Sequence, residues 1–353
     1  MTRASFGQSL LPKRLSRLAS LKLPHHHHFS TTVAIIAEES NPALKFIPDY
    51  EGVEFLVGND AKTLASDPRT LDTEAFIYIV PGSVEALSAA WATAKKPKWV
   101  HSFYTGIDAL SGFAGESLKE GEQTLTNAKG AYSPSLAEWV ITSCLYFNKQ
   151  IQRCQINREQ KVWDKFVMNT LYGKTIGFVG FGHIAQTSAK LAKAFGMRVL
   201  ALRKNNDKEA PYADVVFPLD SSLSMLSECE FVVCSLPNTP STMNFLGEEE
   251  FNAMPSTSVL ISIGRGTAID EVALDQALEK KSIAGAALDV FREEPLDVLS
   301  PLWRHENLLL TAHNADFTDD YCMRGWDVWK ANWEAYRAGK AFVTAVKTPS
   351  EGY

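Results

Sequence analysis

Residues 173–185 read GKTIGFVGFGHIA, and this stretch decides the fold of the chain. The apolar run 174–180 is typical of a buried strand, and a helix-forming segment follows it directly. Between the two, Gly180 permits a tight turn, Gly182 lets the backbone approach a pyrophosphate, and the small Ala185 lets the helix pack on the strand. The first N–H groups of that helix would face the phosphates. The stretch therefore predicts a dinucleotide-binding strand–turn–helix unit.

Short apolar runs bounded by Gly, Pro or Asp recur on both sides of this unit, as expected for buried strands. From the first unit onward, they are 174–180, 197–202, 215–217, 231–235, 259–263, 285–290 and 308–311. The earlier runs are 32–37, 55–58, 76–80 and 99–103. Helix-like segments such as 83–94 separate the runs, and this alternation is typical of parallel α/β sheets. The polar, glycine-containing stretch 112–121 is interpreted as a surface loop.

Two longer helical patterns divide the chain into domains. Ser133 and Pro134 suit the start of a helix, and the pattern after them predicts one helix over 133–155. The segment 321–342 carries an aromatic stripe at helical spacing, which favours core or interface packing. Its members are Trp326, Trp329, Trp333 and Tyr336. We predict a leader at 1–31, a substrate domain from 32–132 and 317–353, and a dinucleotide domain at 133–316.

The composition excludes several classes of protein. A length of 353 residues favours two domains. The 35 Lys and Arg residues are outnumbered by 41 Asp and Glu residues, so the sequence gives no support for a nucleic-acid surface. Apolar runs stay well below the roughly eighteen residues of a membrane-spanning helix. Five cysteines without a CxxC pair argue against a disulfide framework or a metal site, and for a reducing compartment.

The start of the chain differs from the rest. Residues 1–37 contain no Asp or Glu, whereas Arg, Lys and Ser are frequent and the leucines fall on one helix face. An acid-free, basic, amphipathic leader is typical of an organelle transit peptide, so we exclude residues 1–31 from the fold as a disordered leader. This predicts a mitochondrial protein, with a plastid less favoured. The alternative is a disordered basic tail on a cytoplasmic protein.

The residues after the second strand of the dinucleotide unit bear on the cofactor. An NAD enzyme carries an acid there that binds the ribose hydroxyls. Here the strand 197–202 is followed by Arg203 and Lys204. An acid would repel a 2′-phosphate, whereas a guanidinium binds it with paired hydrogen bonds. The sequence therefore favours NADP(H). NAD(H) is the alternative, in which Arg203 is only a surface charge.

Three charged residues follow later strands, at the sheet edge where open α/β folds bind ligands. They are Arg265, Glu294 and His313. Reduction of a 2-oxo acid needs a cation for the carboxylate or carbonyl and an acid that protonates the developing alkoxide. Arg265 suits the first task and His313 the second, while Glu294 would fix the imidazole tautomer. Taken singly, Arg265 is equally consistent with a solvated loop charge and His313 with a core histidine.

An ordered set of motifs then covers nearly all of the chain after the leader. They are YTGID (104–108), AKGAYSPSLAEW (128–139), GKTIGFVGFGHIA (173–185), SLPNTPST (235–242), GRGTAIDEVAL (264–274), AALDVFREEPL (286–296) and TAHNA (311–315). In this order they resemble the D-isomer-specific 2-hydroxyacid dehydrogenase family. The resemblance implies an α/β fold of two doubly wound parallel-sheet domains, with a Rossmann NAD(P)-binding domain inserted into a flavodoxin-like substrate domain.

The resemblance also implies roles for single residues. Arg265, Glu294 and His313 would be catalytic. The cofactor contacts would be Gly180, Gly182, His183, Ile184, Arg203, Lys204, Pro237, Thr242, Ile263 and Asp289, the last through the nicotinamide carboxamide. Ser83, Thr105, Gly106 and Arg265 would bind the substrate. Two departures from the family pattern are Ala312, where proline usually precedes the histidine, and Ser262, where asparagine is common.

The implied activity is hydride transfer between NADPH and a small 2-oxo acid, with glyoxylate or hydroxypyruvate favoured. Glu294 argues against a formate dehydrogenase, which carries glutamine at that position. The family resemblance also implies a homodimer formed through the dinucleotide domain, with the helix over 133–155 contributing. The alternative function is a dinucleotide-sensing, corepressor-like binding protein without turnover. The leader and the Arg–Glu–His set disfavour that alternative.

Overall fold

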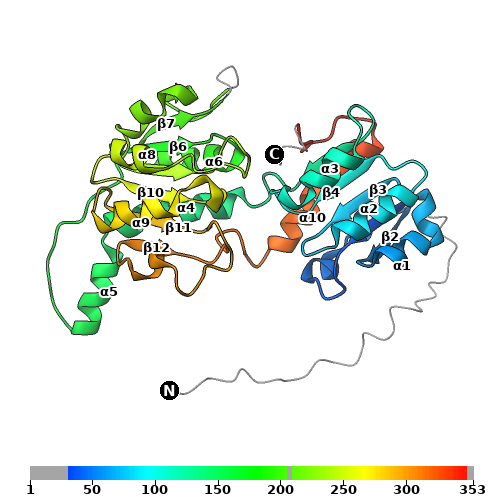
Figure 1. Ribbon diagram of the computed structural model, residues 1–353, viewed down its shortest axis with the longest axis horizontal. Coiled ribbons are helices and arrows are strands. Elements are labelled where there is room, and N and C mark those ends of the chain that lie inside the picture. Colours follow the sequence, from blue (N-terminus) through cyan, green and yellow to red (C-terminus); the bar gives the residue numbers. More distant parts are fainter. Residues whose placement is uncertain (1–30, 205–208, 348–353) are drawn as a thin grey trace.

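The computed structural model describes residues 31–204 and 209–347. Figure 1 shows two lobes, each built around one sheet. Every pair of neighbouring strands in the described ranges runs parallel. The chain builds the first sheet, then the second, and returns to the first as its last helix. The prediction of two parallel-sheet α/β domains, one inserted into the other, is confirmed.

The second sheet contains the seven strands expected from the later apolar runs. Its order is β12-β11-β10-β9-β6-β7-β8. The strands are β6 (Thr175–Val179), β7 (Arg198–Leu202), β8 (Val215–Phe217), β9 (Phe231–Cys234), β10 (Val259–Ser262), β11 (Gly285–Leu288) and β12 (Leu308–Leu310). One face packs on α4 (Ser133–Asn148) and α6 (His183–Ala194). The other packs on α7 (Ser222–Leu226), α8 (Glu248–Ala253) and α9 (Glu271–Glu279).

The first sheet has the order β2-β1-β3-β4-β5. Its strands are β1 (Thr31–Ile36), β2 (Val53–Gly58), β3 (Ala75–Tyr78), β4 (Trp99–Ser102) and β5 (Thr124–Asn127). The helices α1 (Ala61–Ser66), α2 (Val84–Thr93) and α3 (Ser111–Ser117) cover one face, and α10 (Tyr321–Arg337) covers the other. Trp326, Trp329 and Trp333 of α10 are at most 1% exposed, so the aromatic stripe packs in the core as predicted.

Two sequence-based assignments are wrong, and one strand was missed. The predicted loop 112–121 contains part of α3, because burial of Phe113 and Ala114 outweighs the low helix propensity of glycine. The strand β5 was not predicted, since its TLTN sequence is short and half polar. The predicted single helix over 133–155 is broken at Gln150, whose φ is 50°.

The break separates α4 from α5 (Ile151–Gln160) for a local reason. The carbonyl oxygen of Asn148 accepts a hydrogen bond from the N–H of Asn169 instead of continuing the helical ladder. The Asn148 side chain donates a second bond to the carbonyl oxygen of Thr170. These bonds anchor the returning chain at the end of α4, so α5 leaves in a new direction (Figure 1).

The predicted leader lies outside the described residues, apart from Thr31, which already belongs to β1. Its role in targeting stays a prediction. In the described ranges, the helices are all too short or too polar to cross a bilayer. The same ranges contain no cluster of His, Cys, Asp and Glu side chains suited to a metal ion.

Candidate active site

The glycine-rich turn lies between β6 and α6, as the sequence predicts. Gly180 has a φ of 85°, and its carbonyl oxygen accepts a hydrogen bond from Ser235 Oγ at 3.0 Å. Gly182 is the N-cap of α6, and open space surrounds the position of its missing Cβ. Within the described part of the chain, no side chain caps this helix. Its first N–H groups are therefore available to an anion, which fits a dinucleotide pyrophosphate.

His183 is the first residue of α6, and Ile184 follows it. The imidazole Nδ1 of His183 lies 2.8 Å from Ser133 Oγ at the start of α4. Burial lowers the pKa of His183, and the charge of Lys129 lowers it further. The neutral ring therefore links the phosphate-binding turn to the segment that enters the second domain.

The remaining predicted cofactor contacts lie at the same edge of the seven-stranded sheet. Arg203 and Lys204 follow β7, the parallel neighbour of β6. Arg203 Nη1 donates to the carbonyl oxygen of Glu209 at 3.2 Å, which holds the side chain at this edge. After β9, Thr242 Oγ1 donates to the carbonyl oxygen of Pro237 at 2.6 Å and so closes a tight turn. Ile263 follows β10 and is 5% exposed.

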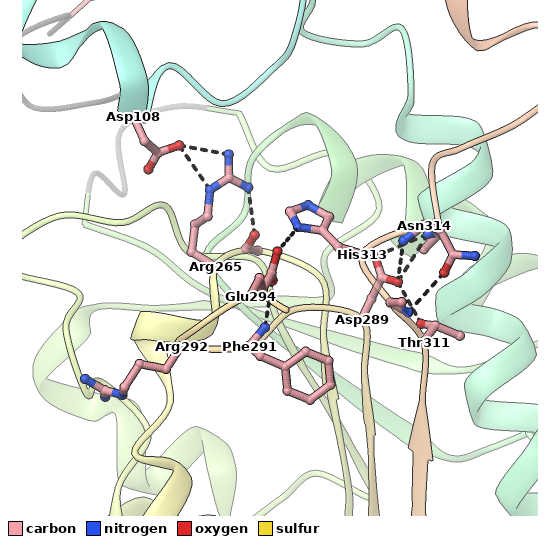
Figure 2. Close-up of polar contacts among 12 residues, drawn as sticks. Asp108, Arg265, Asp289, Phe291, Arg292, Glu294, Thr311, His313 and Asn314 are labelled. Carbon is pink, nitrogen blue, oxygen red and sulfur yellow. Dashed lines mark hydrogen bonds and ion pairs between the residues drawn. The ribbon is translucent and has the colours of Figure 1, made fainter. Parts of the chain in front are cut away.

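His313 and Glu294 form the pair that the sequence suggests (Figure 2). His313 Nδ1 lies 2.7 Å from Glu294 Oε2, and Glu294 Oε1 accepts a hydrogen bond from the N–H of Phe291 at 2.9 Å. Both carboxylate oxygens are thereby fixed. Because Nδ1 faces the carboxylate, the geometry assigns the Nδ1 hydrogen to this bond. Nε2 remains to exchange a proton with a substrate, and the side chain is 43% exposed.

Asp289 holds the turn that carries His313, in addition to the cofactor contact that the resemblance implies for it. It is 1% exposed, and its Oδ1 accepts hydrogen bonds from Thr311 Oγ1 at 2.7 Å and from the N–H of Asn314 at 3.0 Å. Its carbonyl oxygen accepts a bond from the N–H of His313 at 2.8 Å. This buried carboxylate stiffens the turn that carries His313, where Ala312 replaces the proline usual in the family. Its contact with a nicotinamide carboxamide stays a prediction.

Arg265 has a partner that sequence reasoning missed. Its Nε and Nη2 donate to Oδ2 of Asp108 at 3.1 and 2.9 Å, across from the first domain. A Cβ on Gly106 would overlap Nη2, so the guanidinium rests directly on the Gly106 backbone. The predicted substrate residues Gly106 and Arg265 are therefore brought together. Asp108 is part of the YTGID motif that was singled out, which is the signal that would have found it.

The other residues predicted to bind the substrate, Ser83 and Thr105, also form hydrogen bonds within the first domain. Ser83 Oγ caps α2 by accepting from the N–H of Ala86 at 3.0 Å, and the N–H of Ser83 donates to Asn59 Oδ1 at 2.6 Å. Asn59 thus occupies part of the helix N-terminus at Ser83, where the substrate is predicted to bind. The carbonyl oxygen of Thr105 accepts from Asn127 Nδ2 at 2.7 Å, which fixes the loop that ends in Gly106.

Asp316 is a further acid that sequence reasoning did not single out. Burial raises the pKa of its carboxyl group, whereas the charges of His313 and Arg265 act to lower it. Asp316 therefore lies within the electrostatic reach of both predicted catalytic cations. The cysteines are all free, as expected for packing residues. Burial raises the pKa of the Cys234 thiol to about 11, which leaves it unreactive near neutral pH.

Comparison with known proteins adds independent findings. A profile described as D-isomer specific 2-hydroxyacid dehydrogenase, NAD binding domain, matches residues 141–315. A glyoxylate reductase of Pyrococcus horikoshii is 40% identical over 293 residues, which cover 80% of this chain and 85% of that protein.

Solved structures share the fold of the chain. A D-isomer specific 2-hydroxyacid dehydrogenase family protein from Aeromonas salmonicida has a TM-score of 0.73 and 25% identity, over 90% of this chain and 99% of that chain. A probable 2-hydroxyacid dehydrogenase from Rhizobium etli CFN 42, solved with NADP, HEPES and L(+)-tartaric acid, has a TM-score of 0.77 and 21% identity. That match covers 92% of this chain and 99% of the other, and at this identity it speaks for the fold alone.

Proposed function

The chain belongs to the D-isomer-specific 2-hydroxyacid dehydrogenase family, and from this premise we propose that it reduces small 2-oxo acids with NADPH, glyoxylate or hydroxypyruvate foremost. Membership confirms the expectation of an NAD(P)-dependent oxidoreductase that acts on CH–OH groups. The substrate preference is supported by the name of the Pyrococcus horikoshii relative, a glyoxylate reductase. The preference for NADPH is supported by Arg203 and Lys204 at the end of β7.

The observation that carries the proposal is the His313–Glu294 pair in the same site as Arg265. NADPH, when bound, would supply the hydride. Arg265 would bind the substrate carboxylate or carbonyl oxygen, and His313 Nε2 would donate the proton that the developing alkoxide needs. Glu294 would stabilise the imidazolium and hold its orientation. Closure of the two domains would exclude water from this chemistry.

A panel of 2-oxo acids, each measured with NADPH and with NADH, tests the proposal. We expect kcat/KM to be highest for glyoxylate or hydroxypyruvate and to fall for branched and aromatic 2-oxo acids. With the preferred acid, NADPH should exceed NADH by about tenfold or more, because a charge-assisted hydrogen bond to the 2′-phosphate contributes about 1.5–3 kcal/mol. Absence of turnover with every acid would refute the proposed activity.

The variant Arg203→Asp tests the assignment of NADP(H) as the cofactor. The new carboxylate would repel a 2′-phosphate and accept hydrogen bonds from ribose hydroxyls, so the NADPH to NADH ratio should fall at least about tenfold. The order of the acids in the panel should stay the same. A ratio below one in the unchanged enzyme, or no response to the substitution, contradicts the assignment of NADP(H).

We propose that the active species is a homodimer formed by the segment 151–172 of the dinucleotide domain. Figure 1 shows α5 and the chain after it standing away from the lobe, and α5 contains no buried residue. Trp163 is 92% exposed and Val167 is 80% exposed. Large exposed apolar side chains on a projecting segment favour an interaction site, and a second copy of the same segment would bury them.

Analytical ultracentrifugation tests the dimer. The unchanged chain should sediment as two copies, and Trp163→Asp together with Val167→Asp should shift it to one copy, because two charges would be buried in the interface. The control is Val298→Asp, which changes a residue that is 86% exposed on another loop. The proposal fails if the control separates the copies as readily as the double variant, or if the unchanged chain is monomeric.

A further inference from the structure

A carboxylate of the first domain binds the side chain of Arg265, which belongs to the second domain. Asp108 lies in the short 3₁₀ helix Asp108–Leu110 of the first domain, and Arg265 follows β10 in the second. Figure 2 shows the two side chains pointing toward each other. Asp108 Oδ2 accepts both Nε–H and Nη2–H, at 3.1 and 2.9 Å. This ion pair therefore joins the two domains at a residue proposed to bind substrate.

The contact leaves part of the guanidinium free. A guanidinium has five N–H groups: one on Nε and two on each terminal nitrogen. Asp108 engages one on Nε and one on Nη2, and Nη1 donates one to the carbonyl oxygen of Gly264 at 2.9 Å. One N–H on each terminal nitrogen has no partner among the described residues. Two N–H groups on adjacent terminal nitrogens match the two oxygens of a carboxylate, or a carboxylate and a carbonyl oxygen.

The backbone fixes where the free part of the guanidinium lies. Nη2 rests on Gly106, at a distance that a Cβ would not tolerate. Gly106 adjoins Thr105, in the loop where the substrate carboxylate is predicted to bind. The pair is about one third exposed, at 32% for the Arg265 side chain and 35% for Asp108. Pairs so open to water contribute little to stability, so positioning is the better account of this contact.

We propose that Asp108 is a positioning residue for substrate binding, which brings Arg265 across to the Gly106 loop and orients its free N–H groups toward the 2-oxo acid. Asp108 binds the side of the guanidinium, and the substrate binds its end, so both are present in the productive complex. This inference rests on the proposed function, because it needs Arg265 to contact the substrate.

Asp108→Asn tests the inference, since it keeps the shape of the side chain and removes its charge. The amide oxygen can still accept both N–H groups, but the pair loses its charge, and charge-assisted hydrogen bonds are roughly twice as strong as neutral ones. We therefore expect kcat/KM to fall about 10- to 100-fold, mostly through KM, with an unchanged Kd for NADPH. A KM below that of the unchanged enzyme would overturn the inference, because it would make Asp108 a competitor of the substrate.

A double-mutant cycle separates positioning from an independent effect. Arg265→Ala should raise KM strongly, and adding Asp108→Asn to it should change kcat/KM by less than about twofold, because the group that Asp108 orients is gone. If the two effects multiply, Asp108 does not act through Arg265 and the inference fails. If Arg265→Ala leaves KM for every 2-oxo acid unchanged, the proposed function fails instead.

Folding is checked in the same series. Asp72→Asn removes a carboxylate of the same domain, which pairs with Lys95 at 3.2 Å on the surface, and should leave kcat and KM unchanged. The thermal midpoint of Asp108→Asn should match that of Asp72→Asn. A midpoint lowered only in Asp108→Asn, with KM unchanged, assigns the pair to domain stability and overturns the positioning role.

Discussion

Replacement of His313 by Asn should lower kcat for 2-oxo-acid reduction by about 10²–10⁴-fold, the range that a positioned general acid supplies. His313 has a φ of 50°, a left-handed conformation that asparagine accepts more readily than most residues. The substitution therefore removes the acid without straining the turn. Stopped-flow single turnovers with NADPH measure the effect on hydride transfer itself. A variant that keeps more than one tenth of the rate would remove His313 from the mechanism.

Glu294→Gln is the matched control for His313→Asn. The amide keeps the size of the side chain, but it has one acceptor oxygen in place of two, so it can accept from the N–H of Phe291 or from the imidazole and the charge is lost. We expect a smaller fall in kcat than in His313→Asn, because the general acid is kept and only the charge that orients it is lost. In both variants the Kd for NADPH should stay unchanged, since neither residue lies at the phosphate-binding turn.

The sequence was most informative where one local pattern determines one structure. The turn at Gly180 and Gly182 needs only its glycines and its neighbouring strand and helix, and it forms as predicted. The stripe of tryptophans on α10 is likewise set by helical spacing alone. Such features are visible in one chain because their physical cause is local in sequence.

The sequence was least informative where partners come from distant segments. Asp108 and Arg265 are separated by 157 positions, and a carboxylate in a polar motif looks the same whether or not it meets a guanidinium. Asp289 follows a strand, and its burial beneath the His313 turn depends on where β12 ends. The break at Gln150 depends on a bond between Asn169 and Asn148. Propensity is a weak guide in such places, because tertiary contacts decide them.

Acid should destabilise the first domain through a histidine that takes no part in the proposed chemistry. His101 lies in β4 and is fully buried, with Nδ1 2.7 Å from Thr126 Oγ1. Thr126 Oγ1 also accepts a hydrogen bond from Trp99 Nε1 at 2.7 Å. His101 Nε2 is buried without a partner among the described residues. Burial disfavours the charged imidazole and lowers the pKa of His101 to about 3.

The sign of the pH effect follows from which state takes up the proton. Below the ordinary pKa of 6.5 the unfolded chain protonates His101, whereas the folded chain does so only near pH 3. The contribution of His101 to the free energy of unfolding is therefore fully present above pH 6.5. It falls by about 1.4 kcal/mol for each pH unit below that, about 5 kcal/mol in all. Denaturant unfolding followed by tryptophan fluorescence between pH 7.5 and 4 measures this slope.

His101→Leu isolates this histidine from the other groups that titrate in the same range. Leucine has a similar volume and no charge, so the variant loses the bond to Thr126, which costs about 1 kcal/mol at every pH. Its stability should then decline less steeply with acid than that of the unchanged chain, by about 1.4 kcal/mol per pH unit between pH 6 and 4. The two curves should converge below pH 6 and then cross. Parallel curves would show that His101 does not resist protonation, and that the acid sensitivity comes from other groups.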